Sequence, residues 1–344
     1  MAAVPIKPRR VIAEGLAAGR IIPFLGAGAS SFASSLQNIS PPSGTELLAT
    51  LAEEAELEIY CGKKCGRPLY DLSRVASYYQ LVKETRRELD RRLGQLTGNP
   101  ACNPNKLHHM LARIAKTRPL LIVTTNYDAL LEKAFDQIGV GYDVVATAAD
   151  RLSYRGLKED DDASRNDGGM IYHRLGGTPD FNAIDPRELL LNLKDRSIIY
   201  KVHGSVPSGE SWAGGYLIAE EDYTRFLGRM DRNHIYPYKI KTIMQTKEEM
   251  PNGGKRLKNS LLFLGYSLND WNLRVLMDEL GVGQGLPGEE RHNAVLKQPD
   301  PVARLLLEKR NISVIDADLS EFVTELNASL ANFCPPFQDM MAVA

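Results

Sequence analysis

Short runs of hydrophobic residues alternate along the chain with longer segments in which hydrophobic residues recur at helical spacing. Runs that are apolar nearly throughout are typical of strands buried on both faces of a parallel sheet. The pattern predicts such strands at residues 20–25, 119–124, 142–146, 197–202, 260–264, 292–296 and 312–315.

The segments between these runs have apolar residues spaced by about 3.6 positions, which predicts helices that each bury one face. The predicted helices are 44–56, 71–93, 106–115, 128–137, 220–227, 269–280, 301–309 and 319–333. Strands and helices that alternate in this way indicate an α/β fold. We therefore predict a Rossmann-like, doubly wound parallel sheet with helices on both faces.

Two stretches interrupt the alternation. Residues 147–196 contain an acidic run followed by glycines and prolines, and we interpret them as a small inserted helical or irregular subdomain or lid. Residues 229–259 predict a helix and a surface loop, and the charge runs in both stretches are most simply solvated surfaces. The prediction is thus one domain over residues 1–334 and a C-terminal tail at 335–344.

Composition narrows the class of protein. The 344 residues include 42 Lys+Arg and 43 Asp+Glu, a net charge of −1, so binding of nucleic acid by bulk charge is not expected. We find neither an apolar run of about 18 residues nor a secretory leader, and expect no membrane span. Four cysteines are too few and too scattered for a disulfide framework, so we expect a cytoplasmic protein.

The first candidate motif is Gly26-Ala27-Gly28-Ala29-Ser30, directly after the first predicted strand. Glycines let the backbone turn tightly and approach a bound group, so that free amides at a strand end can hold a pyrophosphate. Ser31 stands where the dinucleotide fingerprint has its third glycine, and a purely structural turn is the alternative.

The second motif is Thr125-Asn126-Tyr127-Asp128, where an apolar strand stops and a helix pattern begins. Ligands of parallel sheets bind outside the carboxyl ends of the strands, so Asn126 and Asp128 are candidates for the same edge as the glycine turn. Alternatively, Asp128 is only a helix cap.

The third motif is Lys201-Val202-His203-Gly204, again at a strand end. A histidine placed there can act as a general base near neutral pH, although a lone histidine is more often structural. We assign no role to the other histidines, which are His108, His109, His173, His234 and His292.

The fourth motif is Gly265-Tyr266-Ser267, at the end of the strand at 260–264. A small residue and a hydroxyl suit close contact with a ribose, and a tight strand-to-helix turn is the alternative reading. Four strand ends with glycine-rich or polar tips are a more specific signal than any one of them.

Taken in this order, the four motifs resemble the sirtuin superfamily, and the chain looks closest to the sirtuin-like proteins of bacterial anti-phage defence, which hydrolyse NAD. The resemblance implies NAD as substrate, with Asn126 orienting the attacking water and the nicotinamide ribose, and His203 acting as base or hydrogen-bond partner. It implies further substrate-binding residues: Gly26, Ala27, Gly28 and Ser30 for the pyrophosphate, Asp128 for the carboxamide, Gly265 and Ser267 for the adenosine ribose, and Thr125 and Tyr266 beside them.

The chain also departs from the deacylating sirtuins. These carry two Cys-x-x-Cys pairs after the catalytic histidine, which hold a structural zinc, whereas only Cys334 follows His203. Cys61, Cys65 and Cys102 supply just three thiols, so we predict no metal. These departures favour NAD hydrolysis to nicotinamide and ADP-ribose over protein deacylation.

Two other function classes remain open. One is an NAD-dependent protein deacylase, and the other is a non-catalytic scaffold that senses NAD or ADP-ribose. Direct nucleic-acid binding would depend only on a few basic residues near 255–258 and 86–92 and is not expected.

A hydrolase that depletes NAD needs restraint in a healthy cell. The resemblance implies abortive infection as the cellular role. We expect control through a homo-oligomer and a co-encoded partner, such as a HerA-type ATPase or DNA translocase.

Overall fold

A computed structural model describes residues 8–32, 39–59, 68–147, 171–178, 180–186, 188–206, 215–230, 237–249, 255–266, 277 and 292–333. Its centre is a nine-stranded sheet in the order β11-β10-β9-β1-β2-β6-β3-β4-β5. The strands are β1 (Ile21–Leu25), β2 (Leu121–Thr124), β3 (Tyr142–Thr147), β4 (Ile171–Leu175), β5 (Asn182–Ile184), β6 (Ser197–Lys201), β9 (Ser260–Leu264), β10 (His292–Leu296) and β11 (Ile312–Asp316).

All neighbouring strands from β11 to β3 are parallel, while β4 and β5 are added to the β3 edge in antiparallel orientation. From β1 the chain continues on one side to β2, and it later returns on the other side of β1 to form β9, β10 and β11. This reversal places a topological switch point between β1 and β9, where ligands of open α/β sheets bind outside the carboxyl ends.

Helices cover both faces of the sheet, as the sequence predicts. One face packs against α1 (Pro8–Ala17), α6 (Lys106–Thr117), α7 (Leu130–Ile138) and α13 (Leu319–Leu330), and the other against α9 (Glu220–Met230), α10 (Tyr238–Gln245) and α12 (Pro301–Lys309). Strand β1 shows why the strands are apolar throughout: Ile21 and Leu25 are buried in one core, and Ile22 and Phe24 in the other.

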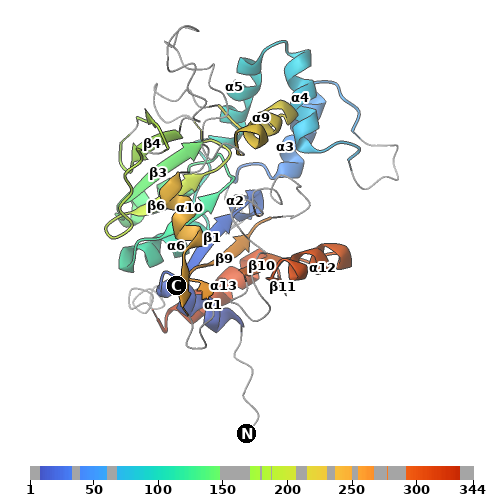
Figure 1. The fold of residues 1–344 in the computed structure, drawn as a ribbon. Helices are drawn as coiled ribbons and strands as arrows, with labels where there is room; N and C mark the ends of the chain where they lie inside the picture. The colour runs from blue at the N-terminus through green and yellow to red at the C-terminus, as the bar shows by residue number, and fades with distance from the viewer. Residues whose placement is uncertain are drawn as a thin grey trace.

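A third core holds a helical module made of α3 (Gly44–Glu54), α4 (Leu72–Val82) and α5 (Arg86–Thr97). The buried side chains of Leu51, Tyr79 and Leu89 meet Tyr216 and Ile218, which lead into α9. Figure 1 shows α3, α4, α5 and α9 gathered at one end of the molecule, away from α1 and α13.

The predicted strands are all present, with ends within two residues of those expected. The single helix predicted over 71–93 is wrong, because the chain breaks between α4 and α5. Glu84 adopts a left-handed φ of 60°, and the Thr85 side chain caps α5 by accepting from the Glu88 amide. A helical hydrophobic period continues across such a break, so the period alone does not reveal it.

The irregular stretches contain more strand than expected. The described part of 147–196 extends the sheet through β4 and β5, and its function as a lid stays a prediction. The surface loop predicted within 229–259 contains a two-stranded sheet of β7 (Lys247–Glu249) and β8 (Lys255–Leu257). Short α2 (Ala27–Ser31) and α1 were not predicted, and the helix predicted at 269–280 lies outside the described residues except for Met277.

Within the described ranges, none of the helices has both the length and the apolar character needed to cross a membrane.

Candidate functional site

The four sequence motifs follow four adjacent strands that end at the same level. Leu264 of β9 pairs with Leu25 of β1, Leu25 pairs with Thr124 of β2, and Thr124 pairs with Lys201 of β6. Because these strands are parallel, the residues after each pair meet at one edge of the sheet. The fold therefore brings together the described members of all four motifs, while Ser267 lies outside the described residues.

The glycine motifs lie directly against each other. The Gly26 amide donates to Leu264 O and the Gly28 amide to Gly265 O, both at 2.9 Å. Gly265 has a φ of 74°, and a Cβ there would lie 2.1 Å from the Ala29 nitrogen, while a Cβ on Gly26 would lie 2.7 Å from Gly265 O. These glycines thus allow two strand ends to pack closely, which supports the alternative that the motif is a structural turn. Ala27 between them is exposed at the switch point.

Asn126 is buried and its side-chain amide is fixed. Its Nδ2 donates to Gly26 O and to Ser30 Oγ, both at 2.9 Å. Both amide hydrogens are then in use, so the group cannot flip without losing two bonds. The acceptor Oδ1 has no hydrogen-bond partner among the residues that the structure describes, and it is available to a ligand or water.

His108, to which the sequence analysis assigns no role, supports this arrangement from α6. Its Nδ1 accepts from the Asn105 amide at 3.1 Å, and its Nε2 lies 3.5 Å from Ser30 Oγ. Burial lowers the pKa of His108 to about 3, so the ring is neutral and its one proton is on Nε2, facing Ser30. The sequence signal that could have pointed to His108 is its position three residues after Asn105, which is the spacing of a capping box at the start of a helix.

Asp128, Thr125 and Tyr266 have local bonding partners. Asp128 Oδ1 accepts from the Leu130 amide at 3.0 Å, which supports the helix-cap alternative and leaves Oδ2 without a hydrogen bond to any described residue. The Tyr266 hydroxyl donates to Leu25 O at 3.0 Å. Its oxygen lies 2.9 Å from Thr125 Oγ1 and therefore accepts a hydrogen bond from the Thr125 hydroxyl. Thr125 and Tyr266 thus join β2 to β9 across the end of β1.

His203 lies two residues beyond β6, just as Asn126 lies two residues beyond β2, so their positions correspond on adjacent strands. Its ring is partly exposed and meets the Tyr223 ring edge-on, with centroids 5.6 Å apart. Burial lowers the pKa of His203 to about 4, so the ring is neutral at physiological pH. In the described part of the chain, neither ring nitrogen has a hydrogen-bond partner.

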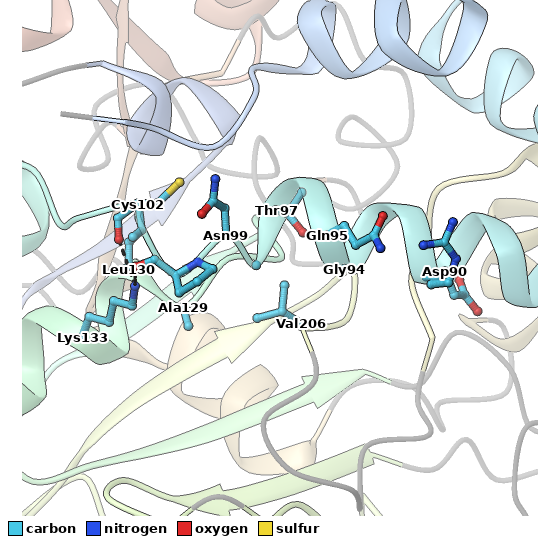
Figure 2. Close-up of a pocket in the computed structure, with 13 residues that line it drawn as sticks. Asp90, Gly94, Gln95, Thr97, Asn99, Cys102, Ala129, Leu130, Lys133 and Val206 are labelled. Atoms are coloured by element: carbon cyan, nitrogen blue, oxygen red, sulfur yellow. Dashed lines mark hydrogen bonds between the residues drawn. The ribbon is translucent and has the colours of Figure 1, made fainter. Parts of the chain in front are cut away.

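A pocket of about 500 Å³ adjoins this edge (Figure 2). It is bounded by the end of α5, residues 98–102, the start of α7 and Val206, and Lys133 donates to Pro100 O and Cys102 O beside it. None of the predicted site residues lines the pocket, although Ala129 follows Asp128 directly and the Val206 amide donates to Tyr127 O at 2.8 Å.

The described residues contain no group of three or more His, Cys, Asp or Glu side chains that could hold a metal ion. Cys102 is buried as a free thiol, and burial raises its pKa. Cys61 and Cys65 lie outside the described residues.

Comparison with known families identifies the fold. A model of the SIR2-like domain matches residues 120–315, more than half of the chain. The chain belongs to the SIR2-like domain family. The matched SIR2-like region includes β2, β6 and β9 with the motifs that follow them, while the glycine turn at 26–30 precedes it. Membership implies an NAD-dependent enzyme, with NAD as its substrate. A search of curated proteins found no match.

Proposed function

We propose that this SIR2-like protein is an NAD hydrolase that releases nicotinamide and ADP-ribose. The observation that carries the proposal is the strand register, which puts Asn126 and His203 at corresponding positions beyond adjacent strands. Asn126 follows β2, one strand from the switch point between β1 and β9, and His203 follows β6, two strands from it. A dinucleotide in that crevice would extend across the ends of β9, β1 and β2 toward His203.

The polar atoms at this edge fit NAD. Asn126 Oδ1, Asp128 Oδ2 and the His203 ring nitrogens lack hydrogen-bond partners among the described residues. Ribose hydroxyls and a carboxamide N–H can donate to the two oxygens and to the unprotonated ring nitrogen, while the other ring nitrogen can donate to a hydroxyl. We propose Asp128 for the carboxamide, and Gly265 and Ser267 for the adenosine ribose, with Thr125 and Tyr266 beside them. We propose Gly26, Ala27, Gly28 and Ser30 for the pyrophosphate. Because the Gly26 and Gly28 amides already donate to Leu264 O and Gly265 O, these glycines would contribute a close approach of the backbone and not free amides.

The chemistry requires cleavage of the bond between nicotinamide and its ribose, through a transition state with oxocarbenium character. Nicotinamide is a good leaving group, so the protein has mainly to orient the reactants and stabilise developing charge. The fixed Asn126 amide presents Oδ1 to the water and the ribose. The low pKa of His203 makes it a weak base at neutral pH, which favours a hydrogen bond to a ribose hydroxyl over proton abstraction.

Replacement of either group tests the assignment. We expect Asn126→Ala and His203→Ala each to lower the rate of NAD cleavage by about 10²-fold or more, because each removes a group that orients the reacting bond. Mass spectrometry of nicotinamide and ADP-ribose measures the loss. His109→Ala, a partly exposed histidine on α6, is the matched control and should cleave NAD at the wild-type rate.

Near-native cleavage by both Asn126→Ala and His203→Ala would refute these roles. Formation of O-acetyl-ADP-ribose with an acetylated peptide would instead identify a deacylase. Binding of NAD without any cleavage would indicate a sensing scaffold.

We also propose a cellular role in bacterial anti-phage defence, by NAD depletion and abortive infection. The proposal depends on the resemblance to defence proteins and on the need to restrain such an enzyme. Restraint would come from a homo-oligomer and a HerA-type ATPase or DNA translocase encoded alongside. Cellular NAD should fall during infection in cells that carry the wild-type gene, and it should not fall in cells that carry the Asn126→Ala variant. Unrestrained NAD cleavage by the isolated monomer would contradict control by assembly.

A further inference from the structure

We propose that Lys201 is a positioning residue, which holds the turn carrying Asn126 and Asp128 through two main-chain oxygens, with Glu132 as its buried counter-charge. Lys201 is the last residue of β6, two positions before His203. This inference rests on the proposed function, because it concerns the geometry of the groups that would act on NAD.

The geometry is specific to this lysine. Lys201 is only 1% exposed, and its ammonium group donates to Asp128 O and, at 3.3 Å, to Tyr127 O. Its Nζ lies 2.8 Å from Oε1 of Glu132, which is 3% exposed on the first turn of α7. The lysine thus joins the end of β6 to the turn between β2 and α7.

A buried lysine at this place needs a reason beyond packing. The other residues of β6 are buried as well, and an apolar side chain would continue the strand without removing a charge from water. An ion pair in a core is seldom more stable than apolar residues of similar volume. The two main-chain oxygens that Lys201 binds explain why a lysine stands at this position, because an apolar side chain could not bind them.

The turn that Lys201 holds carries two of the proposed site residues, Asn126 and Asp128. Tyr127 and Asp128 directly follow Asn126, so displacement of their carbonyl groups would move both the Asn126 amide and the Asp128 carboxylate. A displacement of about 1 Å can lower a catalysed rate by about 10²-fold. Arg174, whose Nη2 lies 3.8 Å from Glu132 Oε1, gives the carboxylate a second cation and leaves Lys201 oriented toward the turn.

The test separates positioning from stability. The double variant Lys201→Met with Glu132→Leu removes both charges of the pair together. It also takes the carboxylate from Arg174, which keeps its bond to Thr178 O, so the thermal midpoint should fall by no more than about 10 °C. The turn should nevertheless loosen. We expect amide hydrogen exchange in residues 125–131 to become at least about 10-fold faster, and kcat for NAD cleavage to fall about 10- to 100-fold with a smaller change in KM.

Two matched variants serve as controls. Glu132→Gln keeps the donors of Lys201, so its exchange over 125–131 and its kcat should stay within about 3-fold of wild type. Arg196→Met with Asp143→Asn removes another ion pair, whose atoms lie 2.6 Å apart at the end of β6 opposite to Lys201, and should leave NAD cleavage unchanged. Lys201→Met with Glu132→Gln replaces the first double variant if that one does not fold.

Wild-type exchange and kcat in the folded double variant would overturn the positioning role. Equal loss of kcat in Glu132→Gln would also overturn it, because the ion pair and not the carbonyl contacts would then matter. If the wild-type protein does not cleave NAD, the proposed function fails, and the exchange measurement alone then decides whether Lys201 holds the turn.

Discussion

At the scale of single residues, Gly265 shows how one position determines the shape of the candidate site. Its φ of 74° and its contact with the Gly28–Ala29 backbone leave no room for a Cβ. The resulting approach of β9 to the turn after β1 forms the switch point at which we place the dinucleotide. A neighbouring constraint is the Asn126 amide, whose two donated bonds fix the direction of its oxygen.

We expect Gly265→Ala to lower the free energy of unfolding by about 2–5 kcal/mol, because left-handed strain and backbone overlap add together. Gly139→Ala is the matched control: Gly139 has a φ of 71° but nothing within 4 Å of the added Cβ, so only the strain of about 1–2 kcal/mol applies. Denaturant unfolding measures both values. Equal losses would show that the turn at Ala29 yields to the added methyl group.

At the scale of elements, the helical module is joined to the rest of the fold through α5 and α9. Arg86 Nη1 donates to Asp222 Oδ1 at 2.5 Å, and its Nη2 donates to Tyr216 O. Asp222 is buried and also accepts from the Ile218 and Ala219 amides, so one carboxylate caps α9 and binds α5. Since Tyr223 of α9 meets the His203 ring edge-on, this joint connects the module to the proposed site.

Arg86→Met should lower the free energy of unfolding by about 2–3 kcal/mol, because it leaves the buried Asp222 carboxylate without its cation. Arg91→Met on the same helix is the control. Arg91 pairs with Glu88 on the surface, where solvent screens the ion pair, so its loss should change the free energy of unfolding little. Thermal unfolding of the two variants provides the comparison, and similar midpoints would mean that the joint at Asp222 contributes little.

At the scale of the whole molecule, burial of neutral histidines links stability to pH. Burial lowers the pKa of His108 to about 3, and the pKa values of His203 and His292 to about 4, from an ordinary value of 6.5. The unfolded chain therefore binds more protons than the folded protein between pH 6.5 and 4. Stability is then complete above about pH 6.5 and is lost as the pH falls through this window.

Each histidine should contribute a slope of about 1.4 kcal/mol per pH unit within that window. His292 is the clearest test, since its Nδ1 accepts from the Leu261 amide at 2.9 Å and joins β10 to β9. His292→Asn keeps an acceptor but does not titrate there, so unfolding measured from pH 7 to 4.5 should show a slope smaller by that amount. An unchanged slope would contradict the linkage.

The sequence alone determined the α/β class, the positions of the predicted strands and the four motifs after them. It could do so because hydrophobic period and strand-end chemistry are local properties. The break at Glu84 was missed because the hydrophobic period continues across it, although Thr85 and Glu88 have the spacing of a helix cap. The antiparallel strands β4 and β5 were missed because they depend on what the segments pack against.

Only the tertiary structure decided which side chains meet. It inserts β6 between β2 and β3, which puts His203 and Asn126 at corresponding positions beyond adjacent strands. It also buries Lys201 against the turn at Tyr127 and Asp128, and His108 beside Ser30. Nothing local distinguishes a lysine at a strand end that reaches water from one that binds two carbonyl oxygens. The difference arises from strand order and from contacts between residues far apart in the chain, which no hydrophobic period encodes.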